Sequence, residues 1–302
     1  MQLKLGSEKS GFIYGGEIVK KLLKHLNPNL ELVLQHCNGS DIIISSTDHS
    51  NHSSDTVNYS KKNYIYYSGE PYIQHFNKHH DKYIIIGTIL DTRSNYIYIP
   101  YFLQSSHLYL KRKYTNNNRP FFLAYCNSNR IGERERLFRM FVEKSSGDIC
   151  HSFGKCNGGK PETQKEKIGG GWAGDELIDK YKDYSFVIAM ENCKKNGYVT
   201  EKIINAFYSG AIPIYWGSNN VNDFFNKKAF INVDDFESFE KCVEYVLNMT
   251  EKQKQAMMNE PIYNTENDIV NLFNHEYNIG GNSKLDEYVE ILKSILHPST
   301  YQ

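Results

Sequence analysis

The chain has 302 residues, of which 40% are hydrophobic and 23% charged, and its 35 Lys and Arg residues balance its 35 Asp and Glu residues. This length favours one large or two medium-sized globular domains. The neutral balance gives no reason to expect nucleic acid or an anionic membrane surface as a partner. No run approaches the roughly 20 apolar residues of a membrane span, and the N-terminus lacks a signal-peptide core. We therefore expect a cytoplasmic or otherwise soluble chain.

The first third alternates short apolar runs with polar connections. Four runs rich in β-branched and aromatic residues predict strands, at residues 31–37, 41–46, 64–69 and 82–90. Residues 15–26 carry leucines and isoleucine at helical spacing. Interleaved strands and helices favour an α/β fold with layered sheets.

A polar, cationic stretch at residues 110–120 follows, and we interpret it as an inter-domain linker. Beyond it the pattern predicts a strand running into a loop, an amphipathic helix at residues 132–144 and a long mobile loop at residues 154–174. Strand, helix, strand and strand come next, and the first βαβ unit should be right-handed with parallel strands. These further strands are predicted at residues 121–129, 184–190, 211–217 and 229–233.

These patterns predict three segments of the chain. Residues 1–115 form an N-terminal domain, residues 116–284 form a C-terminal domain, and residues 285–302 form a final helix that packs back on the N-terminal domain. The final helix carries its apolar residues on one face.

Cysteines and histidines give no pattern typical of a metal site. None of the six cysteines has the CxxC spacing of a zinc site. Cys150 and Cys156 are close enough to form a disulfide or to share a metal with His151, but reduced thiols are the favoured interpretation. The histidines gather in two polar segments, residues 48–54 and 75–80, which have loop composition. We expect neither a metal nor another cofactor.

Residues 190–202 form a segment rich in polar side chains between two apolar elements. Met190 closes a predicted parallel strand, so Glu191 and Asn192 lie at the sheet edge where ligands of open α/β sheets bind. Thr200 is a candidate N-cap for the next helix. A helix N-terminus attracts anions, and Lys202 in its first turn opposes the helix dipole unless an anion lies between. The alternative is a solvated first turn with a capping threonine.

Residues 186–236 resemble the donor-binding segment of the α-1,3/4-fucosyltransferases, with its pattern F-E-N, a polar spacer, Y-x-T-E-K, an apolar helix, P-[IV], G and S-F-[IV]. Met190 and Ala229 depart from that pattern, where phenylalanine and serine are usual. Residues 125–138 resemble the S-N…R segment, whose arginine contacts the donor phosphates. The alignment gives this role to Arg134, with Arg130 and Arg136 as open alternatives.

Residues 66–71, "YYSGEP", resemble a T-G-E-N segment of bacterial members of this family. Glu70 matches its proposed catalytic base, although Ser68 and Pro71 depart from the pattern. His75 and His79 follow closely and are candidates for the acceptor side.

The resemblance implies a GT-B fold, in which two Rossmann-like α/β domains face each other across a cleft. The donor would be GDP-β-L-fucose and the reaction inverting, with no essential divalent metal. The acceptor would be an oligosaccharide, through the 3-hydroxyl of GlcNAc or Glc in an N-acetyllactosamine-type glycan. The chain lacks the C-terminal heptad repeats of bacterial relatives, so we expect a monomer.

The resemblance also assigns donor-binding roles. Arg134 and Lys202 would neutralise the diphosphate, Asn192 and Tyr198 would bond the diphosphate or ribose, and Glu201 would lie at the donor sugar or ribose. Their position alone, at the end of the predicted strand at residues 211–217, makes Tyr215 and Trp216 candidates to stack on a base or sugar, with a place in the core as the alternative. Two alternatives stay open: the same scaffold with another nucleotide-sugar, and a non-catalytic glycan-binding protein.

Overall fold

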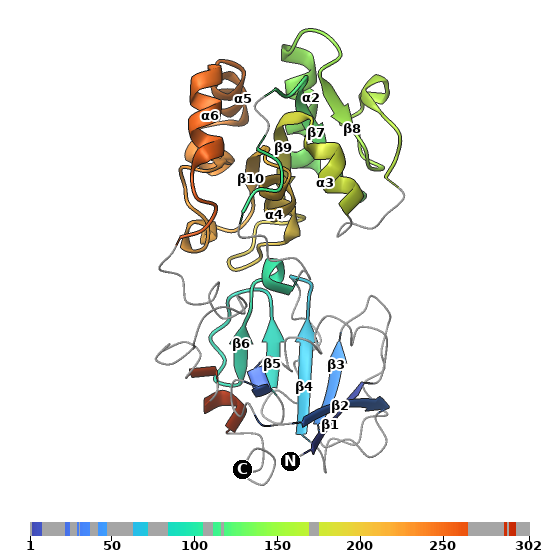
Figure 1. Cartoon of the computed structure of the whole chain (residues 1–302), viewed down its shortest axis with the longest axis vertical. Helices are drawn as coiled ribbons and strands as arrows, with labels where there is room; N and C mark the ends of the chain where they lie inside the picture. The colour runs from blue at the N-terminus through green and yellow to red at the C-terminus, as the bar shows by residue number, and fades with distance from the viewer. Residues whose placement is uncertain are drawn as a thin grey trace. The chain divides into compact units, whose positions relative to one another are not determined.

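Two parallel sheets organise the chain, each in its own compact unit (Figure 1). One unit comprises Met1–Ser106 with Asp268–Gln302, and the other comprises His107–Asn267. The computed structural model describes residues 2–7, 22–24, 29, 31–36, 42–46, 63–71, 84–104, 111–115, 118–168, 175–264, 287–288 and 290–293.

The first unit contains a six-stranded parallel sheet with the order β2-β1-β3-β4-β5-β6. Four strands overlap the predicted ones, whereas β1 and β6 were not predicted. Their bounds are Gln2–Ser7 (β1), Glu31–His36 (β2), Ile42–Ser46 (β3), Asn63–Ser68 (β4), Ile84–Gly87 (β5) and Tyr96–Tyr98 (β6), and a 3-10 helix η2 covers Tyr101–Gln104.

Residues of the predicted C-terminal helix pack within this same unit. Tyr288 and Leu292 are buried, and the Tyr288 hydroxyl donates to the carbonyl oxygen of Tyr98 at 2.7 Å. Tyr288 and Leu292 therefore contribute to the core of this unit.

The second unit contains a five-stranded parallel sheet with the order β11-β10-β9-β7-β8. Its strands are Phe121–Tyr125 (β7), Cys150–Ser152 (β8), Tyr184–Met190 (β9), Ile212–Trp216 (β10) and Ile231–Asn232 (β11). Its helices are Gly132–Lys144 (α2), Asp175–Tyr181 (α3), Glu201–Tyr208 (α4), Phe239–Leu247 (α5) and Glu251–Asn259 (α6), with 3-10 turns Pro161–Thr163 (η3), Val221–Asp223 (η4) and Val233–Asp235 (η5).

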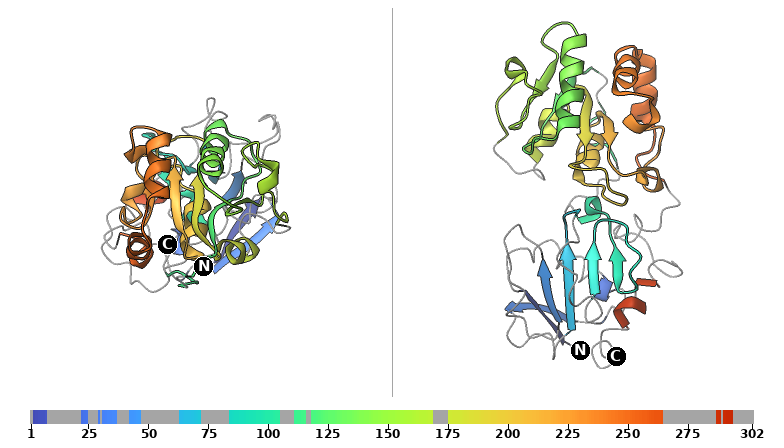
Figure 2. Two further views of the ribbon diagram at one scale, coloured as in Figure 1. Left: turned by 90° about the horizontal axis from the view of Figure 1, so that it is seen from above. Right: turned by 180° about the vertical axis from the view of Figure 1, so that it is seen from behind.

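Strand β9 shows why the sequence of this sheet is so apolar. All seven of its residues are buried, because helices cover both faces of the sheet and leave no solvated side for an alternating pattern. Helix α2 contacts both β9 and α5, as the ribbon in Figure 2 lets the reader follow. Phe138 and Phe141 of α2, Val243 of α5 and Phe186 of β9 belong to one buried core. Helix α4 packs on β9 and β10 and contacts α3.

The strand order creates a switch point between β7 and β9. The chain runs from β7 outward to β8, then crosses back to β9 on the other side of β7. Connections on the two sides of such a point diverge, so a crevice opens beyond the carboxyl ends of the two strands. The residues that follow Tyr125 and Met190 therefore occupy the ligand-binding position of this fold.

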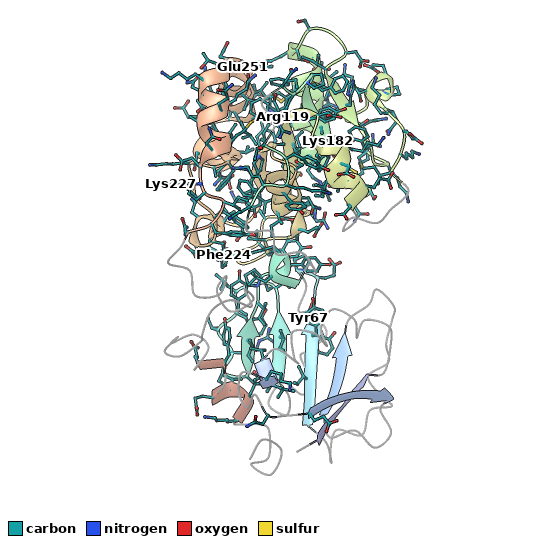
Figure 3. All side chains as sticks on the ribbon, viewed as in Figure 1. Tyr67, Arg119, Lys182, Phe224, Lys227 and Glu251 are labelled. Atoms are coloured by element: carbon teal, nitrogen blue, oxygen red, sulfur yellow. The ribbon has the colours of Figure 1, made fainter. Side chains whose placement is uncertain are left out.

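Residues 110–120 were predicted as a linker. The described residues of this stretch form hydrogen bonds with the rest of the second unit. Arg119 donates from Nη1 to the carbonyl oxygens of Lys182 at 2.7 Å and Tyr184 at 2.9 Å, and from Nη2 to Ser209 at 3.1 Å (Figure 3). Arg112 lies over the ring of Phe207. The linker interpretation was wrong here, because these cations bond to backbone carbonyls at the ends of α4 and α3.

The described part of the predicted mobile loop, residues 154–168, is also held by hydrogen bonds. Lys165 N donates to Ser152 O at 2.9 Å, and Cys156 N donates to Asn127 O at 3.0 Å. A Cβ on Gly154 would lie 2.2 Å from Asn127 O, so only glycine allows this approach. The segment supports the residues that follow β7.

We predict that Arg119→Met lowers the free energy of unfolding of the second unit by at least about 2 kcal/mol, because it leaves several carbonyl groups without their donor. Urea titration followed by tryptophan fluorescence measures this loss, since both tryptophans, Trp172 and Trp216, belong to that unit. Arg139→Met, at an exposed position on α2, is the control and should change the value by less than about 0.5 kcal/mol. Equal effects of the two variants would contradict the structural role of Arg119.

Candidate active site

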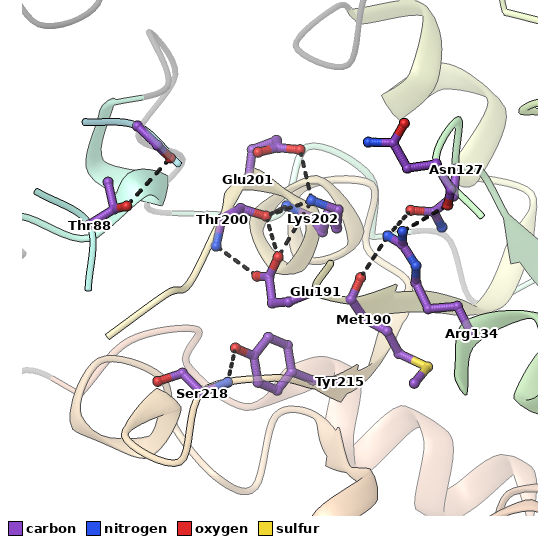
Figure 4. A network of polar contacts seen from close by, with 12 residues as sticks. Thr88, Asn127, Arg134, Met190, Glu191, Thr200, Glu201, Lys202, Tyr215 and Ser218 are labelled. Carbon is purple, nitrogen blue, oxygen red and sulfur yellow. Dashed lines mark hydrogen bonds and ion pairs between the residues drawn. The ribbon is translucent and has the colours of Figure 1, made fainter. Parts of the chain in front are cut away.

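Glu191 ties the end of β9 to the beginning of α4. Its side chain is fully buried, Oε1 accepts from Thr200 N at 2.7 Å, and Oε2 accepts from the Thr200 hydroxyl at 2.8 Å (Figure 4). Thr200 is the N-cap of α4, as predicted. Burial raises the pKa of Glu191 above its ordinary value.

Lys202 lies between two carboxylates. Its Nζ donates to Thr200 Oγ1 at 2.9 Å and to Glu191 Oε2 at 3.4 Å, and lies 3.6 Å from Glu201 Oε1. Burial alone would lower the pKa of Lys202, but the charges of Glu201 and Glu191 outweigh it and raise the pKa. We expected an anion beside Lys202 in this first turn. The carboxylates of Glu191 and Glu201 supply part of that negative charge.

Arg134 bridges the two strand ends at the switch point. It is fully buried in the first turn of α2, and its Nη1 donates to Asn127 Oδ1 at 2.6 Å and to Met190 O at 3.3 Å (Figure 4). Its Nη2 donates to Asn129 O at 2.9 Å. Within the described residues, Arg134 Nε and Asn127 Nδ2 are buried without a hydrogen-bond partner.

The two alternative arginines make other contacts. The side chain of Arg130, in the loop after β7, is 80% exposed, and Arg136 pairs with Glu240 at 2.7 Å on the surface between α2 and α5. Of the three arginines left open by the alignment, Arg134 is the one whose side chain bonds to residues after both strands, Asn127 and Met190.

The loop between β9 and α4 is also held at its tip. Gly197, at a φ of 88°, donates from N to Ser218 Oγ at 2.8 Å and to Asn220 Oδ1 at 2.9 Å. Ser218 N in turn donates to the Tyr215 hydroxyl at 3.0 Å. Because Tyr215 is fully buried, it belongs to the core and is not a stacking platform, whereas Trp216 is half-buried at the end of β10.

The other predicted donor-binding residues all lie in this loop and the first turn of α4. Asn192 is half-buried, while Tyr198 and Glu201 are 3% and 7% exposed. Lys194, in the same loop, pairs with Asp234 at 2.8 Å.

Glu70, the predicted base, belongs to the first unit, where it follows β4 and is half-buried. Its carbonyl oxygen accepts from the Ser68 hydroxyl at 3.1 Å. His75 and His79, predicted for the acceptor side, lie outside the described residues.

The cysteines and His151 do not form the alternative sites. Cys150 and Cys156 are free thiols, and His151 bonds instead to the Tyr184 hydroxyl at 2.6 Å and to Asp148 Oδ1 at 2.9 Å. The described residues contain no cluster of His, Cys, Asp and Glu that could hold a metal ion. Nor does any described helix have the length and apolar character of a membrane span.

Sequence reasoning missed three members of this site, Asn127, Ser218 and Asn220. The strand-end rule that singled out Glu191 after β9 applies equally to Asn127 after β7 and to Ser218 after β10. Their bonds to Cys156 and Gly197, however, join segments that are more than twenty residues apart, which no local pattern reveals.

This arrangement suits an anionic ligand. Arg134 and Lys202 are close enough for the charge of Arg134 to lower the pKa of Lys202. Helix α2 begins at the same edge, and its N-cap, Ile131, provides no side-chain cap for the free N–H groups. Fixed cations and helix N-termini at the carboxyl edge of a parallel sheet are the usual elements of a phosphate site.

Comparisons with known proteins agree with this chemistry. Residues 111–259 match the family model "Glycosyltransferase family 10 (fucosyltransferase) C-term". Alpha-(1,3)-fucosyltransferase FucT of Helicobacter pylori is 47% identical over 72 residues, which are 24% of this chain and 14% of that protein. Alpha-(1,4)-fucosyltransferase of Arabidopsis thaliana is 35% identical over 135 residues, 41% of this chain and 33% of that protein. The chain thus matches less than two thirds of the length of these relatives.

Solved structures show the same fold. A crystal structure of an alpha1,3-fucosyltransferase has a TM-score of 0.69 at 20% identity, covering 100% of this chain and 92% of that one. A DNA-modifying beta-glucosyltransferase has a TM-score of 0.55 at 12% identity, covering 98% and 99%. They confirm the predicted class, an α/β fold of the GT-B type with two Rossmann-like domains; the facing cleft stays a prediction.

We predict that Gly217→Ala disturbs the Glu191 carboxylate. A Cβ on Gly217 would lie 2.5 Å from Cγ of Glu191 and 2.8 Å from the Tyr215 hydroxyl, inside a packed and buried site. Overpacking of this kind costs about 1–3 kcal/mol of unfolding free energy, measured by urea titration.

Gly132→Ala is the matched control, because a Cβ on Gly132 meets no atom within 4 Å and alanine favours the first turn of α2. This variant should be neutral or more stable. Wild-type stability of Gly217→Ala would show that the packing around Glu191 is looser than described.

Proposed function

We propose that the protein is an inverting α-1,3-fucosyltransferase that moves L-fucose from GDP-β-L-fucose to a glycan hydroxyl, because residues 111–259 match the family model of the family 10 fucosyltransferases. The observation that carries this proposal is the placement of Arg134 and Lys202 at the carboxyl ends of β7 and β9. That is where a diphosphate would bind in a fold of this type.

The donor would lie along the loop between β9 and α4. Arg134 and Lys202 neutralise the charge that builds on the departing diphosphate, and fixed cations are most effective in a site shielded from water. Asn192 and Tyr198 bond the diphosphate or ribose, and Glu201 faces the donor sugar or ribose. The burial of Tyr198 and Glu201 supports these roles, since both are held in one arrangement.

Glu70 is the proposed general base. Its carboxylate takes the proton of the acceptor hydroxyl as the hydroxyl oxygen bonds to the anomeric carbon, and the bond from that carbon to the β-phosphate oxygen breaks with its electron pair leaving on GDP. Attack opposite the leaving group inverts a β-linked donor to an α-linked product. A positioned base contributes on the order of 10²–10⁴ in rate.

The acceptor of this reaction would be the 3-hydroxyl of GlcNAc or Glc in an N-acetyllactosamine-type glycan, with His75 and His79 on the acceptor side. Arg134 and Lys202 supply the positive charge at the diphosphate, so we propose that no divalent metal is essential. We further propose that the protein acts as a monomer.

We predict that Glu70→Gln abolishes fucose transfer and leaves GDP affinity within about twofold of wild type, because the amide cannot take a proton but has the same size. A GDP-release assay with GDP-fucose and a panel of small glycan acceptors measures transfer, and calorimetry measures GDP binding. Full activity would remove Glu70 from the base role.

We predict that Arg134→Ala and Lys202→Ala each weaken GDP binding by about 10- to 100-fold, since a hydrogen bond to a charged group contributes about 1.5–3 kcal/mol. Arg136→Ala is the matched control, because Arg136 pairs with Glu240 on the surface, and its GDP affinity should stay unchanged. Unchanged GDP affinity in both test variants would overturn the phosphate assignment, and a loss in the control alone would move the role to Arg136.

The choice of donor has a direct test. The true nucleotide-sugar should raise the melting temperature most, because a ligand that binds only the native state stabilises it by mass action. GDP-fucose is the expected donor; stronger stabilisation by another GDP- or UDP-sugar would assign a different transferase reaction to this scaffold. Glycan binding without GDP release would indicate a non-catalytic glycan-binding protein.

A further inference from the structure

The proposed roles leave Glu191 without one, although it is the most completely buried carboxylate of the site. We infer that Glu191 is a positioning residue that holds the ammonium group of Lys202 in place, and in its charged form, for the anionic ligand at the start of α4. The inference rests on the proposed function only for the identity of that ligand, the diphosphate of the donor.

The hydrogen bonds around Thr200 carry the first step of the argument. The Thr200 hydroxyl donates to Glu191 Oε2 at 2.8 Å and accepts from Lys202 Nζ at 2.9 Å, so the carboxylate orients the hydroxyl that holds the ammonium. The same oxygen of Glu191 accepts directly from Lys202 Nζ at 3.4 Å. Two of the three protons on the Lys202 ammonium group are therefore directed toward Thr200 Oγ1 and Glu191 Oε2.

The second step concerns exposure. The Glu191 side chain is 0% exposed, whereas the Lys202 side chain keeps 20% of its surface accessible. Glu191 thus holds the cation from the protein side, and Lys202 keeps the accessible surface through which a ligand can approach. The third ammonium proton remains for a phosphate oxygen, since Glu201 Oε1, at 3.6 Å, lies beyond hydrogen-bond distance.

The third step concerns charge. Burial and the neighbouring charge of Arg134, in α2, lower the pKa of Lys202, and the carboxylates of Glu201 and Glu191 raise it. With both carboxylates present the ammonium stays charged at neutral and moderately alkaline pH. Without Glu191, only Glu201 opposes burial and Arg134, so the pKa of Lys202 should fall and the ammonium should lose its proton at a lower pH.

Calorimetric titration with GDP between pH 7.5 and 9.0 tests the inference in four proteins: wild type, Glu191→Gln, the double variant Glu191→Gln with Lys202→Arg, and the control Glu244→Gln. The control removes an exposed carboxylate on α5 that pairs with Lys241. Circular dichroism checks that each protein is folded over the same pH range.

We expect the Kd of wild type and of Glu244→Gln to vary little with pH. The Kd of Glu191→Gln should be higher and should rise with pH, by at most about tenfold per unit, the limit for loss of one proton. The double variant should show no such rise, because arginine keeps its charge at these pH values. This pattern of Kd values distinguishes a Glu191 that keeps Lys202 charged from a Glu191 that only stabilises the fold.

Two results would overturn the inference. One is a Glu191→Gln variant with the Kd and pH profile of wild type. The other is a loss of affinity that is equal at every pH and persists in the double variant, which would make Glu191 structural only. If Glu191→Gln does not fold, Glu191→Asp replaces it; its shorter carboxylate should weaken GDP binding, and unchanged binding would refute the inference. A wild-type protein that does not bind GDP would instead contradict the proposed function.

Discussion

One buried carboxylate joins the end of β9 to the start of α4, and the rest of the site depends on it. Glu191 accepts both the backbone N–H and the hydroxyl of Thr200, and thereby fixes the N-cap residue of α4 at the end of β9. A buried charge is tolerated only where partners surround it. Lys202 provides the opposite charge. The Glu191 carboxylate therefore both stabilises this turn and positions the Lys202 ammonium group.

The location of the site follows from the parallel sheet. Helices on both faces exclude polar side chains from the strands, as the seven buried residues of β9 show. Polar groups can gather only where strands end, and the reversal of strand order opens that edge between β7 and β9. Arg134 spans this opening by bonding to Asn127 on one side and to Met190 on the other.

Local sequence was a good guide wherever a pattern reports on burial. The predicted helix at residues 132–144 and strand at residues 184–190 match α2 and β9, because α2 has apolar residues at helical spacing and β9 is a nearly continuous apolar run. The basic stretch at residues 110–120 misled us, since composition cannot distinguish a solvated cation from Arg119, which bonds to backbone carbonyls. The three-residue strands β6 and β8 offered too few residues for a pattern.

The sequence by itself determined the α/β class, the strand end at Met190 and the N-cap Thr200, because these depend on neighbours along the chain. Only the tertiary structure decided which arginine reaches the strand ends, that Tyr215 belongs to the core, and that Lys202 is held by Glu191. Each of these depends on residues brought together by the crossing of strands and helices. Hydrogen-bond partners and burial are properties of that packing, and no single segment contains them.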